Sequence, residues 1–291
     1  MVLGTAKLLM QRRESFSGSI RLIFQPGEEQ PPGGALSVIE NGGLKGVDAI
    51  LGMHIFSITD SGKITIKPGP LLAAPHVVTI RINGKGGHYV MPQNCIDPII
   101  IASRFIECIH RKIKKRISDE KFILGFGKIM GGAQYNRIPD MVEISGSFRT
   151  FNDDDTKLIE EILRKTLDDL MRVYKKQEIP GLPTYKLDIL HGYPVLVNDL
   201  KFSKRVFSIL GENFQDVTNE IDPHFGADDF AYYLERIPGT FILMGTKNVE
   251  KGIIEGNHSS RFDIDEDILK RGVMVLTTIV LDFLKNPRGY V

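Results

Sequence analysis

The chain has 291 residues, of which 42% are hydrophobic and 25% charged, and its formal net charge is +1. This length and composition allow one or two globular domains, and the balanced charge gives no reason to expect a nucleic-acid or anionic-membrane partner. Cys95 and Cys108 are spaced for neither a zinc knuckle nor a disulfide framework, so we expect a reducing, cytoplasmic setting. No apolar run approaches the roughly 20 residues of a membrane span, and the opening MVLGTAKLLMQRRE lacks the length and flanks of a signal peptide.

The first part of the chain alternates helix and strand. The apolar spacing predicts helices over 2–14 and 34–41 and strands over 19–25 and 47–55. Short strands separated by helices favour an α/β domain with a mostly parallel sheet. No Ser, Thr, Asp or Asn precedes the first helix as a cap, so the chain reads as if it opened inside a helix. We assign residues 1–74 to the first part of this domain.

The middle of the chain follows a different pattern. A strand begins at Pro75, and it is followed by a predicted helix over 97–117, strands over 122–130 and 141–150, a helix over 152–174 and a strand over 185–190. This β-α-β-β-α-β order is typical of a ferredoxin-like α+β unit. We therefore predict that residues 75–190 form a separate domain inserted into the first.

After Pro194 the α/β pattern returns. The sequence predicts helices over 199–210 and 228–236, a strand over 240–245 and a terminal helix over about 266–285. Residues 191–291 are thus expected to complete the first domain.

Two adjacent glutamates, Glu28 and Glu29, follow the apolar run Ile20–Phe24 in IRLIFQPGEEQPPGG. A hydrolytic metal site needs ligands that hold the ion and a separate base that takes a proton from water. Neighbouring carboxylates in a loop can divide these two tasks between them. The alternative is a solvated acidic loop without a function.

Two histidines extend this hypothesis. His54 follows an apolar run in LGMHIF, and parallel sheets gather ligands at the carboxyl ends of their strands. His258, in GNHSSRFDIDED, would add a third nitrogen or oxygen ligand for a zinc-like ion. The alternative for His54 is a hydrogen-bonded structural histidine.

Further candidates lie in the predicted inserted domain. His88 follows two glycines in NGKGGHYVMP, where glycine permits close approach of the backbone. Asn136 and Arg149 lie in GGAQYNRIPDMVEISGSFRT, and arginine is a natural clamp for a carboxylate. The alternatives are a strand-exit loop with an incidental histidine and an ordinary surface arginine.

Six motifs in order carry a family resemblance: QPGEE, LGMHI, GKGGHYVMP, NRIPDMVEISGSFRT, GADDFAYYL and GNHSSRFDIDED. Together they resemble the aminoacylase/carboxypeptidase family of metallopeptidases, in the branch of hippurate hydrolases, auxin-conjugate hydrolases and thermostable carboxypeptidases. The resemblance covers essentially the whole chain. It implies a catalytic α/β domain with an inserted α+β lid that mediates homodimerisation, acting on a small-molecule or peptide substrate.

The resemblance also implies roles at the metal. Glu28 matches the general base, and Glu29, His54 and His258 match ligands of a divalent metal, with zinc expected first and manganese or cobalt as alternatives.

In the lid, His88 matches a histidine that stabilises the oxyanion in the partner subunit's active site, and Asn136 and Arg149 match residues that grip the substrate's carboxylate and the reaction centre. The implied reaction is hydrolysis of an amide bond in N-acyl amino acids or in peptides with a free C-terminal carboxylate.

One departure bears on activity. Family members carry a Cys-Gly-His-Asp motif with two metal ligands ahead of a helix that resembles MVLGTAKLL, where this sequence begins. On this resemblance we expect weak metal affinity and impaired activity. The alternative is a catalytically inactive remnant that serves as an oligomerising or binding protein.

Overall fold

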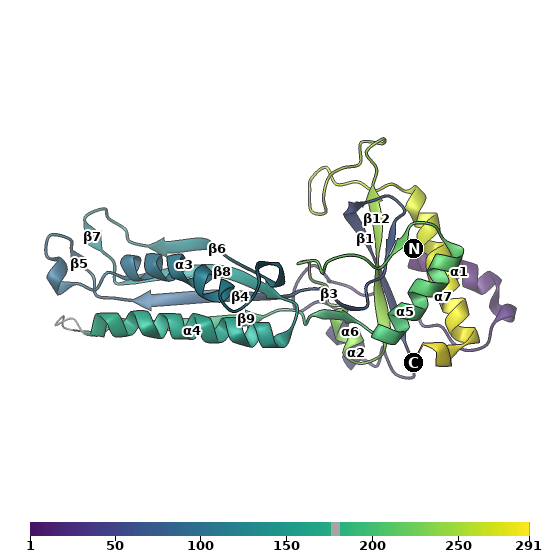
Figure 1. Cartoon of the computed structure of the whole chain (residues 1–291), viewed down its shortest axis with the longest axis horizontal. Coiled ribbons are helices and arrows are strands. Elements are labelled where there is room, and N and C mark those ends of the chain that lie inside the picture. The colour runs from purple at the N-terminus through teal and green to yellow at the C-terminus, as the bar shows by residue number, and fades with distance from the viewer. Residues whose placement is uncertain (176–180, 291) are drawn as a thin grey trace. The chain divides into compact units, whose positions relative to one another are not determined.

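The computed structural model describes residues 1–175 and 181–290, and it divides into two compact units (Figure 1). The first unit combines residues 1–72, 196–224 and 228–290, and the second combines Ala73–Val195 with Phe225–Ala227. Each unit is described by itself below.

The first unit is built on a four-stranded sheet in the order β1-β12-β2-β11. Its strands are β1 (Ile50–Asp60), β12 (Gly239–Lys247), β2 (Ile64–Thr65) and β11 (Val217–Thr218). The β1–β12 and β2–β11 pairs are parallel and the β12–β2 pair is antiparallel, so the sheet is mixed. The apolar run of β12 is buried along nearly all its length, as expected for an inner strand covered on both faces.

Helices pack against this sheet and against one another. They are α1 (Val2–Gln11), α2 (Ala35–Glu40), α5 (Leu200–Asn213), α6 (Ala231–Leu234) and α7 (Asp267–Lys285), with short 3-10 turns at Arg13–Ser15 and Pro287–Gly289. A two-stranded sheet joins β3 (Gly69–Leu72) to β10 (Leu196–Asn198). The side chain of Asp199 accepts the Phe202 N–H and so caps α5 at its predicted start. Among the described residues, no helix is long and apolar enough to cross a membrane.

Two predicted elements of the first unit are wrong. Residues 19–25 form no strand, because no strand among the described residues lies beside them to complete a ladder; Phe24 is 66% exposed. The helix predicted over 228–236 is reduced to α6, since the Asp228 side chain accepts the Phe230 N–H and this local turn competes with helix formation.

The second unit contains the elements β4, α3, β6, β8, α4 and β9 in the predicted β-α-β-β-α-β order (Figure 1). Their bounds are Ala74–Asn83, Pro98–Lys114, Phe122–Gly131, Met141–Thr150, Asp153–Lys175 and Thr184–His191. The sheet order is β6-β8-β4-β9, with every pair antiparallel. A small ribbon pairs β5 (Gly87–His88) with β7 (Arg137–Ile138), and short 3-10 turns lie at Pro92–Asn94 and Asp119–Lys121.

Helix α3 shows why the second unit folds as it does. Pro98 occupies its first turn, and Asp97 caps it by accepting the Ile99 N–H. Ile101, Phe105 and Ile109 recur at helical spacing and are fully buried in the core that α3 and α4 form with the sheet. The core clusters formed by described residues each lie within one unit.

Candidate active site

The two adjacent glutamates lie in a loop of the first unit, residues 26–34, between an extended segment and α2. Glu28 is half-buried, whereas the side chain of Glu29 is 74% exposed. One carboxylate oxygen each from Glu28, Asp228 and Asp229 lie within 4.8 Å of one another. We call these three residues the acidic cluster. Asp228 and Asp229 are both buried.

Two carboxylates of the acidic cluster, Glu28 and Asp228, have pKa values above their ordinary range. Burial, followed by the charges of Asp228 and Glu29, raises the pKa of Glu28 to about 7. Burial likewise raises the pKa of Asp228 to about 6, against the opposing effects of the Phe230 N–H and of nearby His54. A group of close anions of this kind favours a proton or a cation in its midst.

His54 lies within β1 and is paired with Leu243 of β12. We predicted it at the end of a strand over 47–55, but β1 continues to Asp60, because the chain pairs again with Lys247 after an irregularity. The Nδ1 of His54 is in hydrogen-bond contact with the carbonyl of Ile55. With the Nδ1 proton donated there, Nε2 keeps a lone pair that can bind a metal.

His258 and Glu29 approach each other from distant parts of the chain. The Nε2 of His258 lies 4.0 Å from Oε2 of Glu29, and both side chains are about three-quarters exposed. His258 has a φ of 68°, and the N–H of Asn257 beside it donates to the buried Ser57 hydroxyl at 2.9 Å, which fastens this loop to β1. Zinc stands about 2 Å from each ligand, so two ligands of a tetrahedral ion lie roughly 3.3 Å apart, and this pair would have to approach by about 0.7 Å to share one ion.

The donor atoms of Glu29, His54 and His258 can be compared with the ligands that divalent metal ions prefer. Glu29 and His258 offer an oxygen and a nitrogen that lie 4.0 Å apart, and His54 offers a further nitrogen. Mixed carboxylate and imidazole ligands suit zinc, manganese and cobalt. In the chemistry of their donor atoms the three residues therefore fit such an ion. Among the described residues, however, the three donor atoms that the structure brings within 4.8 Å of one another belong to Glu28, Asp228 and Asp229 and not to Glu29, His54 and His258.

Two candidates of the second unit meet at the β5–β7 ribbon. His88 is paired with Arg137, and the N–H of Tyr89 donates to the carbonyl of Asn136 at 3.2 Å. The ribbon thus joins the two motifs that contain His88 and Asn136, although they are far apart in the sequence.

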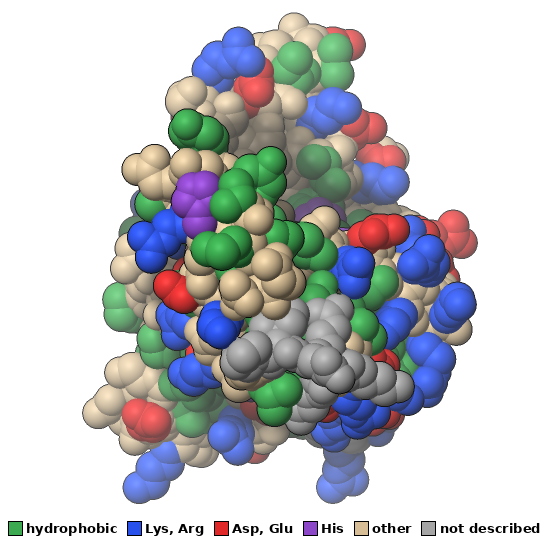
Figure 2. Space-filling model, turned by 90° about the vertical axis from the view of Figure 1, so that its left-hand side faces the viewer, with side chains coloured by type: hydrophobic (Ala, Val, Ile, Leu, Met, Phe, Trp, Pro, Cys, Tyr) green, Lys and Arg blue, Asp and Glu red, His purple; other side chains and the backbone are tan. Residues whose placement is uncertain are grey.

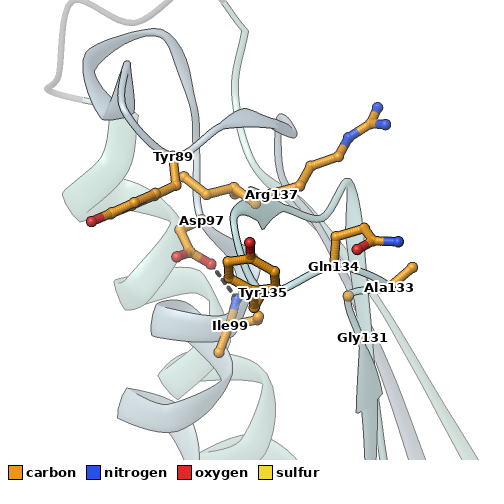
Figure 3. Close-up of a pocket in the computed structure, with 10 residues that line it drawn as sticks. Tyr89, Asp97, Ile99, Gly131, Ala133, Gln134, Tyr135 and Arg137 are labelled. Carbon is orange, nitrogen blue, oxygen red and sulfur yellow. Dashed lines mark hydrogen bonds between the residues drawn. The ribbon is translucent and has the colours of Figure 1, made fainter.

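A shallow hollow lies beside this ribbon. Its lining includes Tyr89, Ile99, Tyr135 and Arg137, and Figure 3 shows the Tyr135 ring beside Ile99 while the Arg137 side chain points away from both. Tyr135 is 98% exposed. Hydrophobic side chains gather on the face of the molecule seen in Figure 2, which looks onto the β5–β7 end of the second unit.

Arg149 is held by its own chain. Its Nη1 donates to the carbonyl of Phe225, in the short segment Phe225–Ala227 that belongs to the second unit and precedes Asp228. Its predicted role of gripping a substrate carboxylate stays a prediction.

The sequence reasoning did not select Gln25, Asp228 or Asp229 as site residues. The amide of Gln25 donates to both oxygens of Asp229, at 2.8 and 2.7 Å. The available signal was two adjacent acids inside the mostly apolar stretch FGADDFAYYL, which is unusual for solvent-exposed charge.

Comparisons with known proteins agree on one family. The model of peptidase family M20/M25/M40 matches residues 1–282. Thermostable carboxypeptidase 1 of Saccharolobus solfataricus is 35% identical over 97% of this chain and 70% of its own length. N-acetylcysteine deacetylase of Bacillus subtilis is 35% identical over 98% of this chain and 72% of its own. The crystal structure of Bacillus subtilis YXEP, described as a dinuclear metal-binding peptidase of the M20 family, matches with a TM-score of 0.80 at 29% identity, over 98% of this chain and 70% of that one.

Proposed function

The chain belongs to peptidase family M20/M25/M40, and from this premise we propose that it hydrolyses amide bonds in N-acyl amino acids or in peptides with a free C-terminal carboxylate. The observation that carries the proposal is the approach of His258 to Glu29 at 4.0 Å, next to a half-buried Glu28. The relatives named for a carboxypeptidase and a deacetylase support this substrate class, and with the family they make the chain a metallo-amidohydrolase or metallocarboxypeptidase by resemblance. The comparisons give no support to the expected impairment or to an inactive remnant.

Glu29, His54 and His258 would hold the divalent ion, with zinc as our first candidate. A bound ion would supply Lewis-acid chemistry, which polarises the substrate carbonyl and makes water more acidic. The relative described as dinuclear supports a metal-dependent reaction for this chain.

Glu28 would move the proton. It takes a proton from the attacking water as the new C–O bond forms, and it returns that proton to the amide nitrogen as the C–N bond breaks. A base is most effective when its pKa lies near the working pH, and the pKa of Glu28, raised to about 7 chiefly by burial, meets this condition.

The second unit would act as an inserted lid. In this proposal His88 stabilises the developing oxyanion in the partner subunit's site, and Asn136 and Arg149 bind the substrate's carboxylate and reaction centre. The adjacency of the His88 and Asn136 motifs at the β5–β7 ribbon supports a shared role.

Homodimerisation through this unit is part of the proposal. Strand β6 is an edge of its sheet, and Ile123, Ile129 and Met130 along it are exposed. An unprotected edge of this kind can pair with the same strand of a second copy. Light scattering should give a dimer mass for the chain and a monomer mass for Ile129→Lys, whereas a dimer in both would place the contact elsewhere. The location of the chain is a further part of the proposal. Its two free cysteines fit a reducing compartment, and we therefore propose a cytoplasmic location.

The proposed chemistry is tested with Glu28→Gln. We expect the chain to hydrolyse N-acyl amino acids with added zinc and the variant to lose at least about 100-fold in kcat, since general-base catalysis contributes about 10²–10⁴-fold. Zinc bound per chain should stay at the parent level in Glu28→Gln and fall in Glu29→Gln, which separates base from ligand. Parent-level turnover in Glu28→Gln would refute the proposal.

A further inference from the structure

Asp229 binds both ends of the loop that carries Glu28 and Glu29. Its side chain is 1% exposed. The Nε2 of Gln25 donates to both of its oxygens, at 2.8 and 2.7 Å, and the Ala35 N–H donates to Oδ2 at 2.9 Å. Gln25 and Ala35 flank the loop on its two sides, so one carboxylate from a distant part of the sequence fastens the start and the end of residues 26–34.

A third side chain fixes the direction of the Gln25 amide. The hydroxyl of Tyr233, a residue that is 2% exposed, donates to Oε1 of Gln25 at 2.7 Å. Because this oxygen accepts from Tyr233, the NH₂ group must face the Asp229 carboxylate. Tyr233, Gln25 and Asp229 therefore form a hydrogen-bonded chain in one consistent direction.

The loop also lies tightly against Asp229 and against itself. A Cβ added at Gly33 would stand 2.1 Å from Oδ2 of Asp229, and one added at Gly34 would stand 2.0 Å from the carbonyl of Pro26. Only glycine allows these approaches. The adjacent Asp228 lies in the acidic cluster with Glu28, so one dipeptide both fastens the loop and borders the proposed base.

We propose that Asp229 is a positioning residue, which holds the loop so that Glu28 and Glu29 keep a fixed orientation towards each other. The inference rests on the proposed function of these two glutamates. Within the loop that carries Glu28 and Glu29, the Gln30 N–H donates to the Gly27 carbonyl and the Gly33 N–H donates to the Gln30 carbonyl. The hydrogen bonds to Asp229 add a tie at each end of this loop. Removing an outer hydrogen-bond partner of a metal site costs about 10–100-fold in affinity or activity.

The test compares Asp229→Asn with a swap of the pair. In Asp229→Asn, an NH₂ group replaces one of the two oxygens that accept from Gln25, so one hydrogen bond is lost and two NH₂ groups face each other. The double variant combines Asp229→Asn with Gln25→Glu, so the new amide at position 229 donates to the new carboxylate at position 25. That carboxylate still accepts from Tyr233, and the net charge is unchanged. Asp282→Asn is the matched control, because Asp282 accepts from Arg205 and Tyr290 of the same unit without touching the loop.

We expect Asp229→Asn to lower kcat for N-acyl amino acid hydrolysis in zinc by about 10–100-fold with little change in KM. Hydrogen exchange at the Ala35 amide should become faster, a readout that does not depend on turnover. The swap should restore kcat to within a few-fold of the parent and return the exchange rate, and Asp282→Asn should change neither quantity.

Two results would overturn the inference. The first is that Asp229→Asn keeps the kcat and the Ala35 exchange rate of the parent while Glu28→Gln is inactive. This result would refute the role of Asp229 and leave the proposed function intact. The other is a folded swap variant whose kcat stays about 10–100-fold below that of the parent. Because the parent is the reference, this result can be read even if the single variant does not fold. Parent-level turnover in Glu28→Gln, by contrast, would refute the proposed function itself, because Glu28 would then not be the base that we propose Asp229 positions.

Discussion

At the scale of single residues, His76 stands out as a buried imidazole in the second unit. It is 5% exposed and stacks against Phe148 with ring centroids 4.6 Å apart. Its Nδ1 lies 3.1 Å from Nδ1 of His191, and its Nε2 lies 3.4 Å from the Thr156 hydroxyl. Burial lowers the pKa of His76 to about 4, with the neighbouring His191 adding to this effect and Asp153 opposing it.

This shift predicts a loss of stability in acid. The unfolded chain binds a proton at His76 near the ordinary pKa of 6.5, whereas the folded chain does so only near 4. The part of the folding stability that depends on a neutral His76 is therefore fully present above pH 6.5, and it is lost as the pH falls from there towards 4. It amounts to about 3 kcal/mol, at about 1.4 kcal/mol per pKa unit. Urea unfolding of the chain at pH 7.5 and pH 4.5 should show this loss, and His76→Gln should show less of it; equal pH dependence in both would contradict the assignment to His76.

The candidate site was only partly predictable from the sequence. Glu29 and His258 were selected because carboxylates and imidazoles are metal ligands, and their side chains do approach each other at 4.0 Å. Asp228 and Asp229 were not selected, because two acids inside an apolar stretch indicate burial at most and do not show which residues they contact. Their role appears only once Gln25, more than 200 residues away, is seen to donate to Asp229.

At the scale of elements, the second unit was predicted more accurately than the first. The cap of α3 and the apolar spacing of α3, β6 and β8 can be recognised in the sequence. The segment 19–25 has the composition of a strand, but composition cannot supply a neighbouring strand. Arg21 instead donates to the carbonyls of Gly43 and Lys45, so side-chain hydrogen bonds hold this segment.

Two neighbouring isoleucines of α3 offer a matched test of packing. Ile101 is fully buried in the core of the second unit, whereas Ile100 is 46% exposed. Ile101→Ala should cost about 2–5 kcal/mol of unfolding free energy, because it removes buried methyl groups and leaves a cavity. Ile100→Ala makes the same chemical change in the same helix and should cost less than about 1 kcal/mol. Urea midpoints of the two variants decide between them, and similar losses would show that α3 does not pack as described.

At the scale of the whole molecule, each unit has the features of an independent folding unit. The core of the second unit is formed by α3, α4 and the sheet, and that of the first by α5, α7 and the β1-β12-β2-β11 sheet. A chain with two separate cores is not expected to unfold in one all-or-none step. Unfolding of the full chain should therefore show two transitions, of which Ile101→Ala shifts only one.

The position of its two ends leads us to predict that the second unit folds as a separate fragment. The chain enters through β4 and leaves through β9, which are neighbours in the sheet with His76 opposite His191, and the Gly192 N–H donates to the Pro75 carbonyl at 2.8 Å. A segment whose ends lie side by side and which has its own core can fold alone. We expect a fragment of residues 73–195 to show cooperative urea unfolding, followed by circular dichroism, and to be destabilised by Ile101→Ala as much as the full chain is. The fragment gives up the contact of Phe225 with Phe151, whose ring centroids are 4.7 Å apart, which should cost about 1 kcal/mol beyond the lost burial. A fragment without a cooperative transition would show that the second unit depends on the rest of the chain for its stability.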